Sequence, residues 1–422
     1  VKTFLKNYGG HKQPKVHPYE VHKQRGDVIH WRFVSPKSTI IYVSHEWTGT
    51  SHADPNGFHV NVLAAVIERI SKGKTNGVHM DPRMEIAYNI RADTFRDEWI
   101  DMMSNAYIWF DWFSVPQDAS SKTDREKALR SIRAYIHNST FVLILAPGCT
   151  HQDRIDPRTK HKALLSYRTW RLNARNVLEM YCAFLKVNER KKSEKHTLLV
   201  QAADRCCWVP STMCTLLSVG ESAYDTFFGD PAFAQKILSN AIDYKTHDHR
   251  VKGEIIMYRL YFSMKTWWMR NFPVSVSGGD DEEDDIGEKE LRNILLWSQD
   301  DDSEWIDRAG VPFLMYPVIQ KNVRALQESL EHLQNAVSKV KRERILRSKV
   351  KYSGSSEFKV LTGNNILHIA IFYILLCVYR AQRLYFYFWK MVSILTRKIH
   401  RAWIRSCLRV LLTTFQTQNF GT

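Results

Sequence analysis

The chain has 422 residues, of which 44% are hydrophobic, and this length indicates roughly two to three domains of a soluble globular type. Lysine and arginine number 60 against 44 aspartates and glutamates, and the excess is concentrated in Lys339 to Lys351 and Arg380 to Arg409. No nucleic-acid-reading motif accompanies this charge, so we expect a solvated basic face and no nucleic-acid partner.

The first 36 residues are polar and basic with scattered Pro and Gly, and we expect a loosely packed lead-in. The run Thr39-Ile-Ile-Tyr-Val43 is β-branched and aromatic, which predicts a buried strand. Asp54-Pro-Asn-Gly57 then supplies turn and helix-start residues. Apolar residues recur at helical spacing from Val60 to Ile70, so a helix should follow that turn.

Two further strands are expected at Tyr107-Ile-Trp-Phe-Asp111 and Phe141-Val-Leu-Ile-Leu145, with helices over Asp124 to His137 and Leu172 to Leu185. Apolar strands that alternate with helices predict a parallel sheet covered on both faces, here over residues 37–190. In such sheets the functional loops follow the carboxyl ends of the strands. We therefore expect functional loops to start at Ser44, after Asp111 and at Ala146.

Beyond residue 195 the pattern turns helical, and we expect a helical extension over residues 191–274. An acidic linker over residues 275–290 contains six consecutive acidic residues, Asp280 to Asp285, which cannot pack against one another. Residues 291–378 read as a further helical region, and residues 379–422 form a basic and aromatic tail to which no role is assigned. Val360 to Tyr379 lacks charged residues, but its first half is polar. We expect it to be partly helical, with a membrane span as the alternative.

The seven cysteines do not indicate a disulfide framework, because their number is odd and no pair has the Cys-x-x-Cys spacing. Reduced thiols favour a cytoplasmic location, and no metal site is expected. The amino terminus carries no apolar signal segment, and it begins with Val rather than Met, so a start upstream stays open.

Three segments in this order resemble the TIR-like family in the broad sense that includes plant TIR and fungal heterokaryon-incompatibility domains. The first is Tyr42-Val-Ser-His-Glu-Trp47 with the following Asp54-Pro-Asn-Gly57, as in TIR-like proteins of single-celled algae. The second is Ile108-Trp-Phe-Asp-Trp-Phe-Ser-Val-Pro-Gln117, and the third runs from Ile132 through the strand at 141–145 to Leu178-Glu179. The resemblance implies a flavodoxin-like parallel sheet. Where plant TIR domains have Trp-Cys before the glutamate, this chain has Arg175-Asn176.

A second resemblance is to ankyrin repeats, in Asp307-Arg-Ala-Gly-Val-Pro-Phe-Leu314 and in Gly363-Asn-Asn-Ile-Leu-His-Ile-Ala370. Gly310 and Gly363 are 53 positions apart, whereas ankyrin repeats recur at about 33. The resemblance therefore implies a degenerate, ankyrin-like all-α region over residues 291–378 that docks protein partners.

The TIR-like resemblance implies two functions that the sequence leaves open. As an interaction module in signalling, the domain would self-associate or recruit a protein partner. As an NAD hydrolase, it would use Glu179 as the catalytic carboxylate that stabilises the positive charge developing on the ribose, with NAD as substrate rather than cofactor. Ser44, His45, Trp47 and Asp111 would then line the NAD-binding cleft. The alternatives are that Trp47 packs, His45 caps its loop and Asp111 organises the strand end.

Overall fold

The computed structural model describes most of the chain up to residue 348. The described residues are 1–10, 14–74, 77–80, 82, 93–186, 196–210, 219–220, 222–223, 231–269, 272, 286–297 and 305–348, the last range with gaps at 308–310, 321, 339, 342–343, 346–347. They fall into two compact units, the first up to Met257 with residues around Trp268, and the second comprising Tyr258–Trp267 and described residues of Ser277–Ser353.

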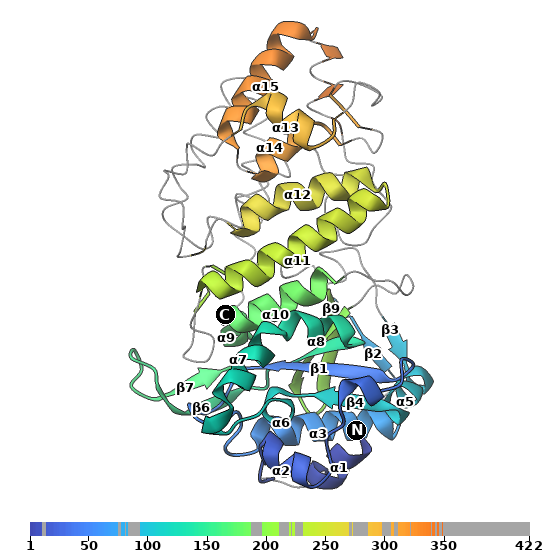
Figure 1. The fold of residues 1–422 in the computed structure, drawn as a ribbon, viewed down its shortest axis with the longest axis vertical. Coiled ribbons are helices and arrows are strands. Elements are labelled where there is room, and N and C mark those ends of the chain that lie inside the picture. Colours follow the sequence, from blue (N-terminus) through green and yellow to red (C-terminus); the bar gives the residue numbers. More distant parts are fainter. Residues whose placement is uncertain are drawn as a thin grey trace. The chain divides into compact units, whose positions relative to one another are not determined.

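The first unit is built on a five-stranded sheet in the order β4-β1-β5-β8-β9, seen edge-on in Figure 1. The strands are β1 (Thr39–His45), β4 (Ala106–Trp109), β5 (Phe141–Leu145), β8 (His196–Ala202) and β9 (Arg205–Pro210). The first four run parallel, and β9 pairs antiparallel with β8.

The three strands expected from the sequence are neighbours, with β1 in the middle. Ile41 is opposite both Ile108 of β4 and Phe141 of β5, and both pairings are parallel. All five residues of β5 are buried, as its unbroken apolar run requires for a strand covered on both faces. The predicted parallel arrangement is confirmed for these three strands.

The expectation that residues 191–274 are helical is wrong for their first described part. Residues 196–202 and 205–210 form β8 and β9, which complete the sheet of the first unit. Thr197-Leu-Leu-Val200 is too short an apolar run for periodicity to tell a buried strand from a helix, and its pairing with β5 decides the outcome. The helical prediction holds further on, for α11 (Pro231–Val251) and α12 (Ile255–Met269).

Helices lie on both faces of the sheet, as Figure 1 shows for the first unit. On one side are α3 (Phe58–Ser71) and α5 (Arg96–Ser104), and on the other α8 (Ile132–Asn138), α10 (Ala174–Phe184) and, outside it, α11. Between β4 and β5 the chain also forms α6 (Asp111–Ser114), the 3-10 helix η2 (Ala119–Ser121) and α7 (Lys122–Arg130).

The lead-in is packed, contrary to the expectation of a loose segment. It forms α1 (Lys2–Tyr8), α2 (Tyr19–Gln24) and the 3-10 helix η1 (Trp31–Phe33). Phe4 and Tyr8 are four residues apart on α1 and therefore share one buried face, where the Tyr8 ring stacks on Phe113 of α6 at 5.5 Å between centroids. The prediction was wrong because the composition of residues 1–36 is polar overall, and the two buried aromatic residues contribute little to it.

Two small hairpins complete the first unit. One pairs β2 (Gly77–His79) with β3 (Asp93–Phe95). The other pairs β6 (Cys149–Ile155) with β7 (Lys162–Leu165) directly after β5, and Figure 1 shows it extending away from the sheet. It is followed by α9 (Tyr167–Trp170), which leads into α10.

The second unit is helical where it is described. It contains α13 (Glu288–Ile294), α14 (Met315–Gln320) and α15 (Val323–Ala336) in addition to part of α12. Most of the predicted acidic linker, the second ankyrin-like segment at 363–370, the uncharged segment 360–379 and the tail lie outside the described residues. Within the described part of the chain, no helix has the length and apolarity to cross a membrane.

Candidate functional site

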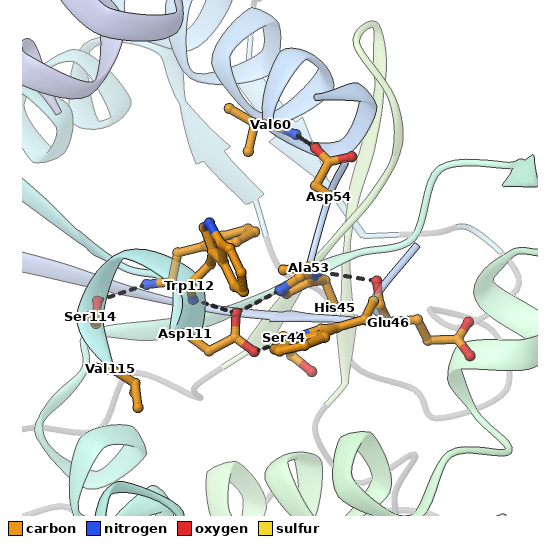
Figure 2. A network of polar contacts seen from close by, with 12 residues as sticks. Ser44, His45, Glu46, Ala53, Asp54, Val60, Asp111, Trp112, Ser114 and Val115 are labelled. Carbon is orange, nitrogen blue, oxygen red and sulfur yellow. Dashed lines mark hydrogen bonds and ion pairs between the residues drawn. The ribbon is translucent and has the colours of Figure 1, made fainter. Parts of the chain in front are cut away.

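The candidate site is a polar network at the carboxyl edge of the sheet, where β1 and β4 end side by side. Because Tyr42 is opposite Trp109 in the parallel pairing, the residues just beyond these positions meet at one edge. Ser44 and His45 end β1, and Asp111 follows β4 as the first residue of α6. Figure 2 shows the His45 ring and the Trp112 backbone N–H directed at the Asp111 carboxylate.

Asp111 is the centre of this network and accepts four hydrogen bonds. Its Oδ1 accepts from His45 Nε2 at 2.9 Å and from the Trp112 backbone N–H at 2.7 Å. Its Oδ2 accepts from Trp47 Nε1 at 2.8 Å and from Arg175 Nη2 at 2.8 Å. Burial alone raises the pKa of this carboxyl, but the charges of His45 and Arg175 and these hydrogen bonds outweigh it and hold the pKa well below its usual range. Asp111 is therefore ionised at neutral pH.

The His45 ring lies between two hydrogen-bond acceptors. Its Nε2 is 2.9 Å from the Asp111 carboxylate, and its Nδ1 lies 3.1 Å from the Glu46 carbonyl oxygen. The ring is buried against Phe110 and meets His59 of α3 edge-on, and burial together with the charge of His45 lowers the pKa of His59 to about 3.

Arg175 connects Asp111 to the second carboxylate of the site. It lies on α10 and is buried, and its Nε donates to Glu179 Oε1 at 2.9 Å while its Nη2 holds Asp111. Burial opposes the charge, but the two carboxylates outweigh this effect and raise the pKa of the guanidinium above its usual value. Two carboxylates, Asp111 and Glu179, thus share the Arg175 guanidinium within a buried site, and His45 contacts Asp111 there.

Glu179, the predicted catalytic carboxylate, lies inside the protein and not at an open cleft edge. It is 1% exposed, and its Oε1 accepts from both Arg175 and the Tyr42 hydroxyl, the latter at 2.9 Å. Its Oε2 is buried and has no hydrogen-bond partner among the described residues. Burial raises the pKa of the Tyr42 hydroxyl, and the neighbouring Glu179 carboxylate raises it further, so this hydroxyl remains a donor.

The network joins both faces of the sheet, because side chains alternate along β1. Tyr42 and Ser44 point toward the α10 side, where Tyr42 holds Glu179 and Ser44 Oγ accepts from Trp170 Nε1 at 3.2 Å. His45 points toward the α3 side, where its ring meets His59. Asp111 lies at the strand edge and bonds to groups from both sides.

The predicted cleft residues are thus brought together, but each is already engaged within the protein. Trp47 uses its indole N–H on Asp111, and its ring meets Trp112 edge-on at 5.6 Å between centroids. Glu46 Oε2 accepts from the Thr169 hydroxyl at 2.5 Å. Ser44, His45 and Asp111 are each less than 3% exposed. These placements fit side chains that organise the edge of the sheet.

Asp54 has a structural role next to the network. Its Oδ1 accepts from Phe58 N–H at 3.0 Å and its Oδ2 from Val60 N–H at 2.8 Å, which caps the start of α3, as drawn in Figure 2 for Val60. Gly57 precedes the helix at φ +65, and a Cβ there would lie 2.2 Å from the Pro14 carbonyl oxygen. The helix start expected from Asp54-Pro-Asn-Gly57 is confirmed.

Arg175 is the residue that sequence reasoning missed as a site residue. The signal was present, because Arg175 stands four residues before Glu179 on a helix whose other positions are mostly apolar. An arginine and a glutamate at that spacing on a buried helix face form an ion pair inside the protein. Among the described residues, no group of three or more His, Cys, Asp or Glu side chains is placed to hold a metal ion.

Comparison of the chain with family models, with curated proteins and with solved structures finds no match.

Proposed function

We propose that this protein is a cytoplasmic protein-interaction module in which a TIR-like domain self-associates or recruits a partner and an ankyrin-like region docks another protein. The observation that carries the proposal is the Arg175 guanidinium between Asp111 and Glu179. A carboxylate that stabilises a ribosyl cation must reach the substrate, whereas Glu179 is buried and its charge is already matched by Arg175. The site therefore supports a rigid scaffold better than hydrolysis.

The sheet supports the TIR-like part of the proposal. Among its parallel strands the order is second, first, third, fourth, which is the flavodoxin-like order, and the antiparallel β9 departs from it. The β6–β7 hairpin offers a contact surface, because Ile155 and Leu164 are 52% and 72% exposed. Cys149, Cys182, Cys206 and Cys207 are free thiols, which supports a reducing compartment.

One described segment supports the ankyrin-like part. The Asp307 carboxylate accepts from the Val311 N–H at 2.8 Å and from the Tyr316 hydroxyl at 3.3 Å, and Ile306 and Pro312 form an antiparallel bridge just before α14. The chain then passes through Asn322, which caps α15 by accepting from the Ala325 N–H at 2.9 Å. Two consecutive helices, as α14 and α15 are here, also follow the β-turn of an ankyrin repeat.

NAD hydrolysis is the second candidate, and one observation favours it. The Glu179 Oε2 atom has no donor among the described residues. A buried carboxylate oxygen without a donor destabilises the folded state, and a catalytic role is one explanation for keeping it. If the helix α10 opened, this oxygen would be the free acceptor at the site.

Incubating the purified full chain with NAD and measuring nicotinamide release separates the two candidates. We expect no release, even at high protein concentration, together with concentration-dependent self-association in sedimentation velocity. Replacing Ile155 and Leu164 by serine should weaken that association. If the wild type releases nicotinamide, Glu179→Gln loses this activity and the exposed control Glu126→Gln keeps it, the interaction-module proposal is wrong and NAD hydrolysis takes its place. A monomer that neither cleaves NAD nor binds a partner would refute both candidates.

A further inference from the structure

The segment Asp27–Ser38, between α2 and β1, places apolar side chains in solvent; we call it the 27–38 loop. Ile29, Trp31 and Phe33 are 47%, 67% and 73% exposed. Single exposed apolar residues are ordinary on protein surfaces, but here three lie within five positions and two of them are large aromatics; we call them the apolar tip. Exposed apolar groups of this kind mark surfaces that bind a protein or a membrane.

The backbone of this loop is fixed by its own hydrogen bonds. The Phe33 N–H donates to the His30 carbonyl and the Val34 N–H to the Trp31 carbonyl, each at 2.9 Å, and the Ser38 N–H donates to the Ser35 carbonyl at 2.9 Å. These consecutive turns fix the backbone on which the Trp31, Arg32 and Phe33 side chains are exposed. Little ordering entropy remains to be lost when a partner covers them.

The charge around the tip is positive on its outer side. Arg25, Arg32 and Lys37 are exposed, and none of the three side chains has a hydrogen-bond or ion-pair partner among the described residues. The two nearest carboxylates are turned inward. Glu20 Oε1 accepts from the Gln117 N–H at 2.6 Å, and Asp27 Oδ2 accepts from Asn7 Nδ2 at 3.0 Å and pairs with His22.

We propose that the 27–38 loop docks this protein on an anionic phospholipid surface, independently of the function proposed above. Tryptophan and phenylalanine insert at the level of lipid headgroups, where an aromatic body can enter the acyl boundary. Three arginine and lysine side chains around them match the negative surface potential of phosphatidylserine-containing leaflets. An apolar tip surrounded by basic side chains therefore has both features that favour binding to an anionic phospholipid surface.

The same charges disfavour a second copy of the chain as the partner of this tip. In a two-fold symmetric contact the loop would meet its own copy, and Arg25, Arg32 and Lys37 would be brought together with like charges. Each basic residue near an anionic leaflet instead gains favourable electrostatic energy. With only three apolar anchors, the docking is weak and reversible, similar to that of proteins that need a second membrane signal.

Vesicle flotation with the full chain tests the proposal. The probes are phosphatidylcholine vesicles and vesicles of phosphatidylserine and phosphatidylcholine in roughly a one-to-three ratio. We expect flotation only with the phosphatidylserine vesicles, and a decrease as salt screens the basic side chains. The basic sequence 380–409 can also attract anionic vesicles, so paired variants decide which part of the chain carries the binding.

The double variant Trp31→Ser, Phe33→Ser should lower the apparent vesicle affinity by at least about tenfold. Arg32→Gln, Lys37→Gln should lower it by about tenfold and flatten its salt dependence. The matched control Phe95→Ser, Val251→Ser removes two exposed apolar side chains elsewhere on the first unit and should bind as the wild type does. Thermal unfolding followed by circular dichroism shows whether each variant is folded. The test requires only that one of the two double variants, the aromatic or the basic one, is folded.

Three results would overturn the proposal. The first is a wild-type chain that does not float with phosphatidylserine vesicles. The second is equal flotation of the wild type and Trp31→Ser, Phe33→Ser, which would assign binding to another part of the chain. The third is loss of self-association in that variant without any vesicle binding by the wild type, which would make the tip an interface between copies.

Discussion

At the carboxyl edge of the sheet, Asp111, Arg175 and Glu179 are closed to solvent and bonded to one another. In the 27–38 loop, Arg25, Arg32 and Lys37 stand in solvent beside exposed aromatic rings. Coulomb interactions are strong in the first region because water is excluded and weak in the second because water screens them. The comparison separates charges that hold the fold from charges that are free to meet a partner.

Replacing Arg175 by methionine should give the largest loss of stability. It leaves two buried carboxylates without their shared cation, and losing one partner of a buried ion pair costs about 3–5 kcal/mol in the free energy of unfolding. The control Arg130→Met removes an exposed arginine of α7 and should change that free energy by less than about 0.5 kcal/mol. Urea unfolding followed by circular dichroism measures both, and equal effects would contradict the buried ion-pair network.

Acid should destabilise the protein through Asp111. Its pKa is depressed in the folded state, so the unfolded chain binds the proton first, and stability present at neutral pH is lost as the pH falls below about 4. Asp111→Asn lacks this carboxyl and should show a shallower loss of stability between about pH 5 and 2. Unfolding midpoints across this range test the prediction. The exposed control Asp124→Asn should show the same dependence of the unfolding midpoint on pH as the wild type. If Asp111→Asn also shows the wild-type pH dependence, the prediction is wrong.

Tyr42→Phe should have a smaller effect, because Glu179 Oε1 keeps its bond to Arg175. Removing one buried donor costs about 1–3 kcal/mol, more when its acceptor is charged. Tyr244→Phe, at a half-exposed position on α11, is the matched control and should be neutral within error. A neutral Tyr42→Phe would show that Tyr42 does not hold Glu179 in solution.

Changes in the 27–38 loop should have the smallest effect on stability. Trp31→Ser, Phe33→Ser touches side chains that are mostly in water in the folded state, so the unfolding free energy should change by less than about 0.5 kcal/mol. The urea midpoint is the measurement. A large loss would show that the tip packs within the fold and would remove the contrast between the two regions.

The adjacency of the first three strands in one parallel sheet was predictable, because short apolar runs alternate with helical patterns. Phe141 to Leu145 favoured a strand covered on both faces, since Pro147 and Gly148 end the run. The strands β8 and β9 were not predictable, since their hydrophobic pattern is as compatible with a buried helix and long-range pairing selects the strand. The packing of α1 was missed because two anchors, Phe4 and Tyr8, are diluted by polar neighbours.

The members of the site that follow the strand ends were predictable, whereas Arg175 and the burial of the site were not. Residues at adjacent strand ends meet in space, and this places Ser44, His45, Trp47 and Asp111 together. Whether Glu179 faces solvent depends on which side of α10 packs on β1, and the spacing of apolar residues left it at the edge of that face. The partner that neutralises it, Arg175, comes from the same helix and closes the site.

The shared guanidinium has a consequence for how this sequence can diverge. In a buried site where one guanidinium serves two carboxylates, a single change at position 175 leaves both carboxylates without their shared partner. A descendant that lost Arg175 would have to neutralise position 111 or position 179 at nearly the same time. Alignments of related sequences should therefore show these three positions changing jointly, as a covarying set, while Arg32 and Lys37 change independently of one another.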